Sequence, residues 1–171
     1  MIRMRYYLAI PLFLLAFLMQ TTMLWRIPIA GYSPNLLLCM VVVFSFIYEE
    51  RYGLILGIAF GLLLDISTSL FLSVQTISFV AVFLVVRLFR SIFNHESLIT
   101  DMFMGLLATP INLFIVWLIY KLMGEPVSVV LVFKSLLPLM IMHFLLVGII
   151  HFIFIRTVIR YRQDMKFTGD F

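Results

Sequence analysis

Charged side chains are scarce in this 171-residue chain, at 12% of all residues, whereas hydrophobic residues make up 64%. Soluble globular domains average about 25% charged and about 45–50% apolar residues. This shortage of charge excludes an ordinary soluble fold, and we infer an integral membrane protein. The net charge of +4 does not indicate nucleic-acid binding, because the basic residues stand at the ends of apolar runs.

Motifs of enzyme chemistry are also missing. The chain has no Gly-x-x-x-x-Gly-Lys phosphate loop, no His-Glu-x-x-His zinc motif and no Gly-x-Ser-x-Gly nucleophile motif. Its one cysteine, Cys39, lies in an apolar run, which leaves neither a disulfide framework nor a thiolate metal site. Asp65 is the one acid deep in an apolar run, since Asp101 stands at a helix start, so an aspartyl dyad is incomplete. We expect no enzyme activity, no cofactor and no metal.

Two histidines, His143 and His151, lie eight residues apart in the last apolar run. This spacing puts them on nearly one helix face but two turns apart, which is too far for one metal ion. The sequence favours hydrogen bonds to neighbouring helices, and a metal or proton-relay role for His143 stays open as the alternative.

Six apolar runs predict an all-α protein with six transmembrane helices in a single domain over residues 1–171. A spanning helix needs about 20 residues, and two of the runs are short. The second run begins with a hydroxyl cap and a proline, Ser33-Pro34, whereas only serine and threonine residues mark the turn between the third and fourth runs. The expected spans are about 6–25, 35–48, 53–71, 72–90, 102–123 and 130–155.

Basic residues set the expected orientation. With the N-terminus inside and six spans, only Arg26, Lys121 and Lys134 fall outside. The inner side then holds Arg3, Arg5, Arg51, Arg87, Arg90, Arg156, Arg160, Arg162 and Lys166. Five spans would send the basic C-terminal tail outside, against the rule, so both termini are predicted to be cytoplasmic.

A stripe of glycines in the third run ends in an acid. Gly53, Gly57, Gly61 and Asp65 follow one helix face and form two overlapping Gly-x-x-x-Gly motifs, which allow close helix approach. We expect this face to pack within the bundle or to receive a partner helix. Asp65 lies about 18 Å along the helix from Gly53, in the outer half of the bilayer, and should face protein. The candidate partners of its carboxylate are Lys134, Arg26 and Lys121.

Three segments form a recognisable pattern: Pro34-Asn35 at the start of the second span, the charged turn Glu49-Glu50-Arg51, and the run from Gly57 to Asp65. Together they resemble the MreD family of rod shape-determining membrane proteins. The chain departs from the family pattern after Asp65, where it has serines and a threonine in place of the usual glycines. The residues that match the family motif are Pro34, Asn35, Phe60, Gly61, Leu62, Leu63 and Asp65.

The resemblance implies a non-enzymatic scaffold of the bacterial cell-elongation (rod) complex, multi-pass in the cytoplasmic (inner) membrane. Its implied partners are MreC and, directly or through MreC, MreB, RodA and a class B penicillin-binding protein. It would help to couple MreB filaments to peptidoglycan synthesis and to regulate cell shape.

A bundle of this family is similar to the S component of energy-coupling-factor transporters, so the alternative is a membrane substrate-binding subunit of a vitamin transporter. The Ala-x-x-x-Ala docking motif usual in the first span of S components is missing, because Ala9 and Ala16 are seven residues apart. The sequence therefore favours the scaffold.

Overall fold

Helices are the regular elements of the computed structural model, which describes residues 9–24, 31–47, 52–90 and 97–167, and side chains within 9–22, 31–46, 52–90 and 97–154. The helices are α1 (Ala9–Met19), continued by the π-helical turn η2 (Gln20–Leu24), then α2 (Leu36–Ile47), α3 (Tyr52–Thr68), α4 (Val74–Arg90), α5 (Leu98–Leu122) and α6 (Val129–Phe167). The prediction of an all-α protein with six helices is confirmed.

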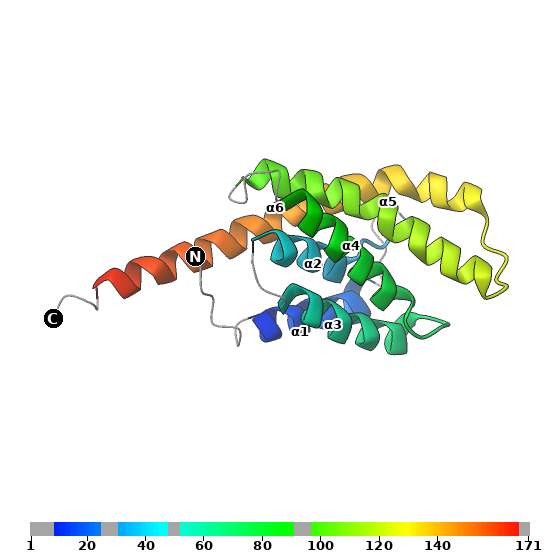
Figure 1. The fold of residues 1–171 in the computed structure, drawn as a ribbon, viewed down its shortest axis with the longest axis horizontal. Coiled ribbons are helices and arrows are strands. Elements are labelled where there is room, and N and C mark those ends of the chain that lie inside the picture. The colour runs from blue at the N-terminus through cyan, green and yellow to red at the C-terminus, as the bar shows by residue number, and fades with distance from the viewer. Residues whose placement is uncertain (1–8, 25–30, 48–51, 91–96, 168–171) are drawn as a thin grey trace.

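Successive helices run in opposite directions along the long axis of the molecule (Figure 1). The turns at residues 69–73 and 123–128 lie together at one end of the bundle, which we call the hairpin end. α3 and α5 begin at the opposite end, where α6 also runs out to Phe167. An up-and-down bundle of this kind needs only short connections between helices.

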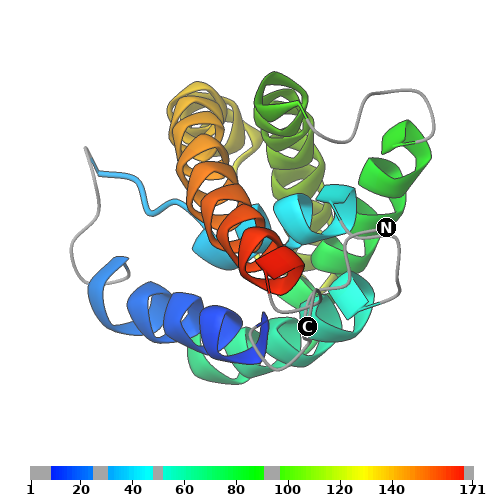
Figure 2. The same cartoon turned by 90° about the vertical axis from the view of Figure 1, so that its left-hand side faces the viewer.

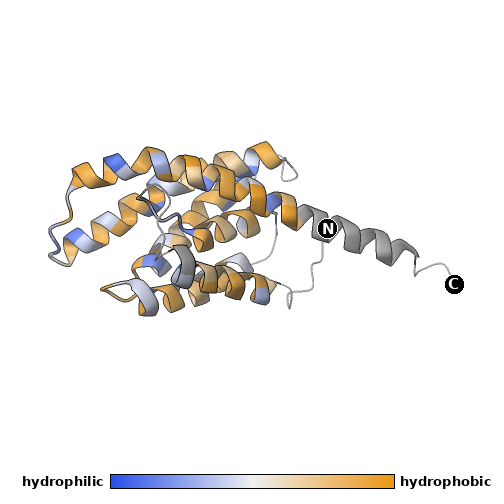
Figure 3. Ribbon diagram, turned by 180° about the vertical axis from the view of Figure 1, so that it is seen from behind, coloured by the Kyte–Doolittle hydropathy of each residue, from blue (hydrophilic) through white to orange (hydrophobic). Residues whose placement is uncertain are grey.

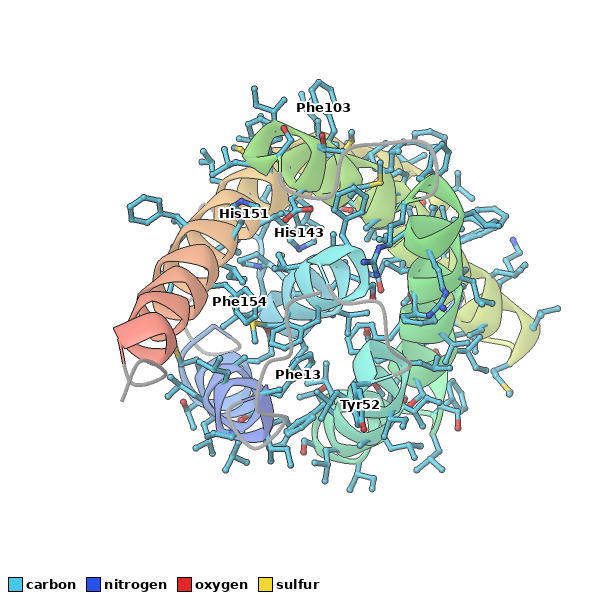
Figure 4. The ribbon with its side chains drawn as sticks, turned by 60° about the vertical axis from the view of Figure 1, so that its left-hand side comes forward. Phe13, Tyr52, Phe103, His143, His151 and Phe154 are labelled. Carbon is cyan, nitrogen blue, oxygen red and sulfur yellow. The ribbon has the colours of Figure 1, made fainter. Side chains whose placement is uncertain are left out.

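The short helix α2 is the core of the bundle. It packs against each of the other five α-helices, which surround it (Figure 2). Its side chains from Leu37 to Phe46 are all buried, as expected for a helix that is apolar on every side. Phe44 of α2 makes edge-on ring contacts with Phe13 of α1 and Phe154 of α6, with centroids 5.1 and 5.0 Å apart, so it joins the first and last helices (Figure 4).

Hydrophobic residues predominate along the helices (Figure 3), and many large apolar side chains are exposed on the outside of the bundle. Ile55, Leu107 and Leu145 are 57%, 42% and 55% exposed, and many other large apolar side chains are exposed to a similar extent. A surface so rich in exposed aliphatic residues matches a lipid environment rather than water.

Two helices, α5 and α6, are long and apolar enough to cross a membrane, over residues 98–122 and 129–154. The apolar stretches 9–22, 36–46 and 52–68 are shorter than a usual span. The last helix continues to Phe167, past residue 155, where the sequence predicts the end of the last membrane span. α3 ends at Thr68 and α4 begins at Val74, so the turn between the third and fourth apolar runs lies at residues 69–73.

Candidate functional site

Asp65 is buried near the end of α3, where its carboxylate meets the first turn of α4. Oδ1 accepts hydrogen bonds from the Gln75 backbone N–H at 2.7 Å and from the Ser69 hydroxyl at 3.0 Å. Oδ2 accepts from the Thr76 backbone N–H at 3.1 Å and from its hydroxyl at 2.8 Å. These two N–H groups belong to the first turn of α4, which has no intrahelical acceptors for them. Asp65 therefore caps α4 and places its negative charge at the positive end of the helix dipole.

The expected partners of Asp65 were bases near the hairpin end, and this expectation is corrected. Within the described part of the chain, neither Lys121 nor Lys134 forms an ion pair with Asp65, and Lys121 instead lies over the Trp117 ring at 5.7 Å. Arg26 lies outside the described residues. The carboxylate has no need of a base, because four donors from the next turn and helix already surround it.

The glycine stripe faces the interior of its own bundle. A Cβ atom added at Gly57 would lie 3.4 Å from the Val41 side chain of α2, which is ordinary contact. At Gly61 it would lie 2.9 Å from the Thr76 Cα atom of α4, closer than side-chain carbons approach a backbone. Gly53 is also buried against α2 and α4. The stripe thus brings α3 onto its two neighbours and leaves no room on this face for a helix of another protein.

The other motif residues of α3 divide between two faces. Phe60 is buried, and its ring lies 5.4 Å from that of Phe13 in α1. Leu62 is half-buried, and Leu63 is 42% exposed on the outer surface. The run from Gly57 to Asp65 therefore combines an inner packing face with an outer apolar one.

Asn35, the other polar motif residue, ties the start of α2 to two more helices. Its Oδ1 atom accepts a hydrogen bond from the Leu38 backbone N–H at 3.0 Å and so caps α2. Its Nδ2 atom donates to Gln75 Oε1 of α4 at 3.2 Å. Its backbone N–H donates to His143 Nε2 of α6 at 2.9 Å.

The residues on either side of Asn35 bond to the first helix. Gln20 donates from Nε2 to the Pro34 carbonyl at 3.1 Å and accepts at Oε1 from the Leu36 backbone N–H at 2.7 Å. The segment from Pro34 to Leu36 is therefore held by η2, α4 and α6 together. Because Gln75 also donates its backbone N–H to Asp65, the two polar motif positions belong to one network.

His143 has its proton on Nδ1, as its neighbours require. The Thr109 hydroxyl donates to the Gly105 carbonyl at 2.8 Å, so its oxygen accepts from His143 Nδ1 at 2.9 Å. His143 Nε2 then serves as the acceptor for the Asn35 N–H. With one donor and one acceptor nitrogen, the ring is neutral. The prediction that the histidines form hydrogen bonds to neighbouring helices is confirmed.

The second histidine, His151, makes a contact that sequence reasoning missed. The Nδ1 atom of His151, which is labelled in Figure 4, is hydrogen-bonded to Asp101 Oδ2 of α5, and both residues are buried. Asp101 and Thr109 are eight residues apart on α5, and their partners are eight residues apart on α6. This equal spacing in the sequence could have indicated both contacts, but Asp101 was interpreted only as a residue at a helix start.

Between these two histidine contacts the helices α5 and α6 approach closely. A Cβ atom added at Gly105 would lie 2.9 Å from Val147 Cγ2, and one added at Gly148 would lie 3.1 Å from Met102 Cε. The interface thus alternates polar contacts with small residues. Within the described residues, no three histidine, cysteine or acidic side chains gather to hold a metal ion.

A comparison with protein families gives a match over most of the chain. The family model described as rod shape-determining protein MreD matches residues 1–160. Neither a curated protein nor a solved structure matches the chain. The family match agrees with the resemblance carried by Pro34, Asn35 and Asp65, and it does not support the transporter alternative.

Proposed function

The chain belongs to the MreD family of membrane proteins, whose role is in rod-shape determination, and we propose that it is a scaffold of the bacterial cell-elongation complex. The family consists of structural proteins and is not known as an enzyme family. The scaffold binds MreC and, directly or through MreC, brings together MreB filaments, RodA and a class B penicillin-binding protein. It thereby helps to couple the filaments to peptidoglycan synthesis.

The proposed topology is one domain that crosses the inner membrane six times, with both termini in the cytoplasm. The alternating helix directions support it (Figure 1). Trp117 and Lys121 lie towards the hairpin end, and residues of these types are common at membrane interfaces. At 1.5 Å per residue, Trp117 lies about 24 Å along α5 from Asp101. Arg87 and Arg90 lie in the last turn of α4, on the proposed cytoplasmic side. α2 can be shorter than the membrane is thick, because other helices surround it.

The observation that carries the scaffold proposal is the internal use of the polar motif. Asp65 caps α4, and Asn35 caps α2 and bonds to α4 and α6. These are contacts that define the shape of a bundle. What the bundle presents to other molecules within the bilayer is a set of exposed apolar helix faces. Such faces suit recognition of a partner's membrane helix by van der Waals packing.

Co-purification with MreC tests the proposal. The full chain and tagged MreC are expressed together, extracted in mild detergent, and the recovered chain is measured relative to its folded amount. Two matched triple-alanine variants change exposed faces on the first and last helices, Ile10, Leu14 and Leu18 on α1, or Leu137, Ile141 and Leu145 on α6. We expect one variant to reduce recovery at least tenfold while the other leaves it unchanged. Absence of the wild-type chain from the purified MreC would refute the proposal, and equal recovery with both variants would place the contact elsewhere.

A further inference from the structure

The buried pair of Asp101 and His151 lies outside the family motif and outside the network around Asn35. Asp101 has no exposed surface and His151 is 2% exposed. One carboxylate oxygen, Oδ2, is hydrogen-bonded to His151, whereas Oδ1 is buried with no hydrogen-bond partner. A buried acceptor without a partner costs about 1–3 kcal/mol, and more when it is charged. Ionisable residues at such a depth are candidates for a functional site.

No other charge in the described surroundings neutralises this carboxylate. The helices packed against α5 and α6 are α2 and α4. The described side chains of α2 carry no charged group, and those of α4 carry Arg87 and Arg90, neither of which forms an ion pair with Asp101. On α5 and α6 themselves, Tyr120, Lys121 and Lys134 lie towards the hairpin end, and His143 lies two turns away with its own partners.

The number of protons on the pair therefore decides its charge. A carboxylate beside a neutral imidazole carries a net charge of −1, with Oδ1 exposed to an apolar interior. One additional proton makes the pair neutral overall, whether it sits on the carboxyl group or on the imidazole. A net charge is costly in an apolar bundle, whereas a hydrogen-bonded neutral pair is not.

We propose that Asp101 and His151 form a proton-binding site that latches α5 to α6. With the additional proton the pair is neutral, and the two helices stay in close contact at Gly105 and Gly148, the next positions along the interface. Loss of that proton leaves a charge between the helices and favours their separation. The latch lies in the half of α6 that leads to Phe167.

Proton linkage gives the sign and size of the effect. In the unfolded chain Asp101 is ionised above about pH 4 and His151 becomes neutral above about pH 6.5. Above pH 6.5 the folded pair holds one proton more than the unfolded chain, so folding is favoured at lower pH and is weakened as pH rises. The unfolding equilibrium constant should increase up to about tenfold per pH unit above pH 6.5.

The experiment is an unfolding titration of the full chain in detergent with sodium dodecyl sulfate at pH 3 to 9. Asp101→Asn keeps the shape and a hydrogen bond but cannot carry the charge, so its unfolding constant should be independent of pH above 6.5. His143→Gln is the matched control on the same helix face, and it should keep the wild-type slope. His151→Gln provides a second test, because a lone protonated Asp101 should move the onset of the slope down to about pH 4.

These results distinguish the latch from a merely structural contact. A wild-type unfolding constant that does not change with pH overturns the proposal, as does a slope that survives Asp101→Asn. Loss of the slope in His143→Gln would assign the proton to the other histidine and would also overturn it. None of these outcomes depends on MreC, so failure of the latch leaves the proposed scaffold function untouched.

Discussion

Replacement of Asp65 tests whether one carboxylate holds the turn between α3 and α4. Asp65 accepts four hydrogen bonds, two at each oxygen. Asp65→Asn retains one acceptor oxygen and so keeps at most two of them, whereas Asp65→Leu loses all four. With about 1.5 kcal/mol for each hydrogen bond to a charged group, the free energy of unfolding should fall by about 3 kcal/mol for asparagine and about 6 kcal/mol for leucine. The second value is comparable to the whole stability of many proteins.

Two measurements on the full chain in detergent check this prediction. Unfolding with sodium dodecyl sulfate gives the change in free energy, and amide hydrogen exchange reports whether the N–H groups of Gln75 and Thr76 lose protection. The matched control is Ser67→Ala, which removes an exposed hydroxyl bonded to the Leu63 carbonyl of the same helix and should cost less than about 0.5 kcal/mol. Wild-type stability of both Asp65 variants would refute the capping role. So would a loss of stability with unchanged amide protection at the start of α4.

Three further predictions use the same unfolding assay. Gly61→Ala should be less stable than Gly57→Ala by about 1–3 kcal/mol, because only the former adds a methyl group 2.9 Å from a backbone atom, the Thr76 Cα. Equal stabilities of the two variants would mean that α4 can shift away. Ser73→Gly should raise stability by about 1 kcal/mol, because Ser73 has a φ of 75°, where glycine carries no Cβ strain; a loss would show that its hydroxyl matters more. Asn35→Ala should lower stability by about 1–2 kcal/mol, and Asn35→Ser, which keeps a capping oxygen, by less than half of that.

The helices were predictable from the sequence because apolar runs, capping residues and charges mark them directly. Ser33-Pro34 predicted a start of the second helix close to the observed one, but Asn35 rather than Ser33 caps Leu38, and the helix begins at Leu36 rather than at Pro34. Basic residues after residue 155 mark the end of the predicted last membrane span, but they do not end the helix, and α6 continues to Phe167.

The partner of Asp65 could not be predicted in the same way. An acid in an apolar run suggests a search for a base, because ion pairs are the obvious means of neutralising charge. Backbone N–H groups leave no mark in a sequence. They became available to Asp65 because the chain reverses at residues 69–73, with Ser73 in a left-handed conformation.

The α5–α6 contacts illustrate a different limit. The spacing of His143 and His151 placed both on one face of a helix, but it did not say which helix that face meets. Only the antiparallel register of α5 supplies Thr109 for one and Asp101 for the other. A search for equal spacings in two neighbouring predicted helices would have proposed both contacts.

The central position of α2 has a consequence for how the protein is made. α2 has 12 residues, about 18 Å of helix, whereas the hydrocarbon core of a bilayer is about 30 Å thick. It is the second helix to emerge from the ribosome, yet four of the five helices that enclose it, α3 to α6, follow it in the chain. At about 5–20 residues per second, roughly 120 further residues take about 6–24 s to synthesise. Throughout that interval, the segment destined for the centre of the bundle depends on the insertion machinery or on α1 for shelter.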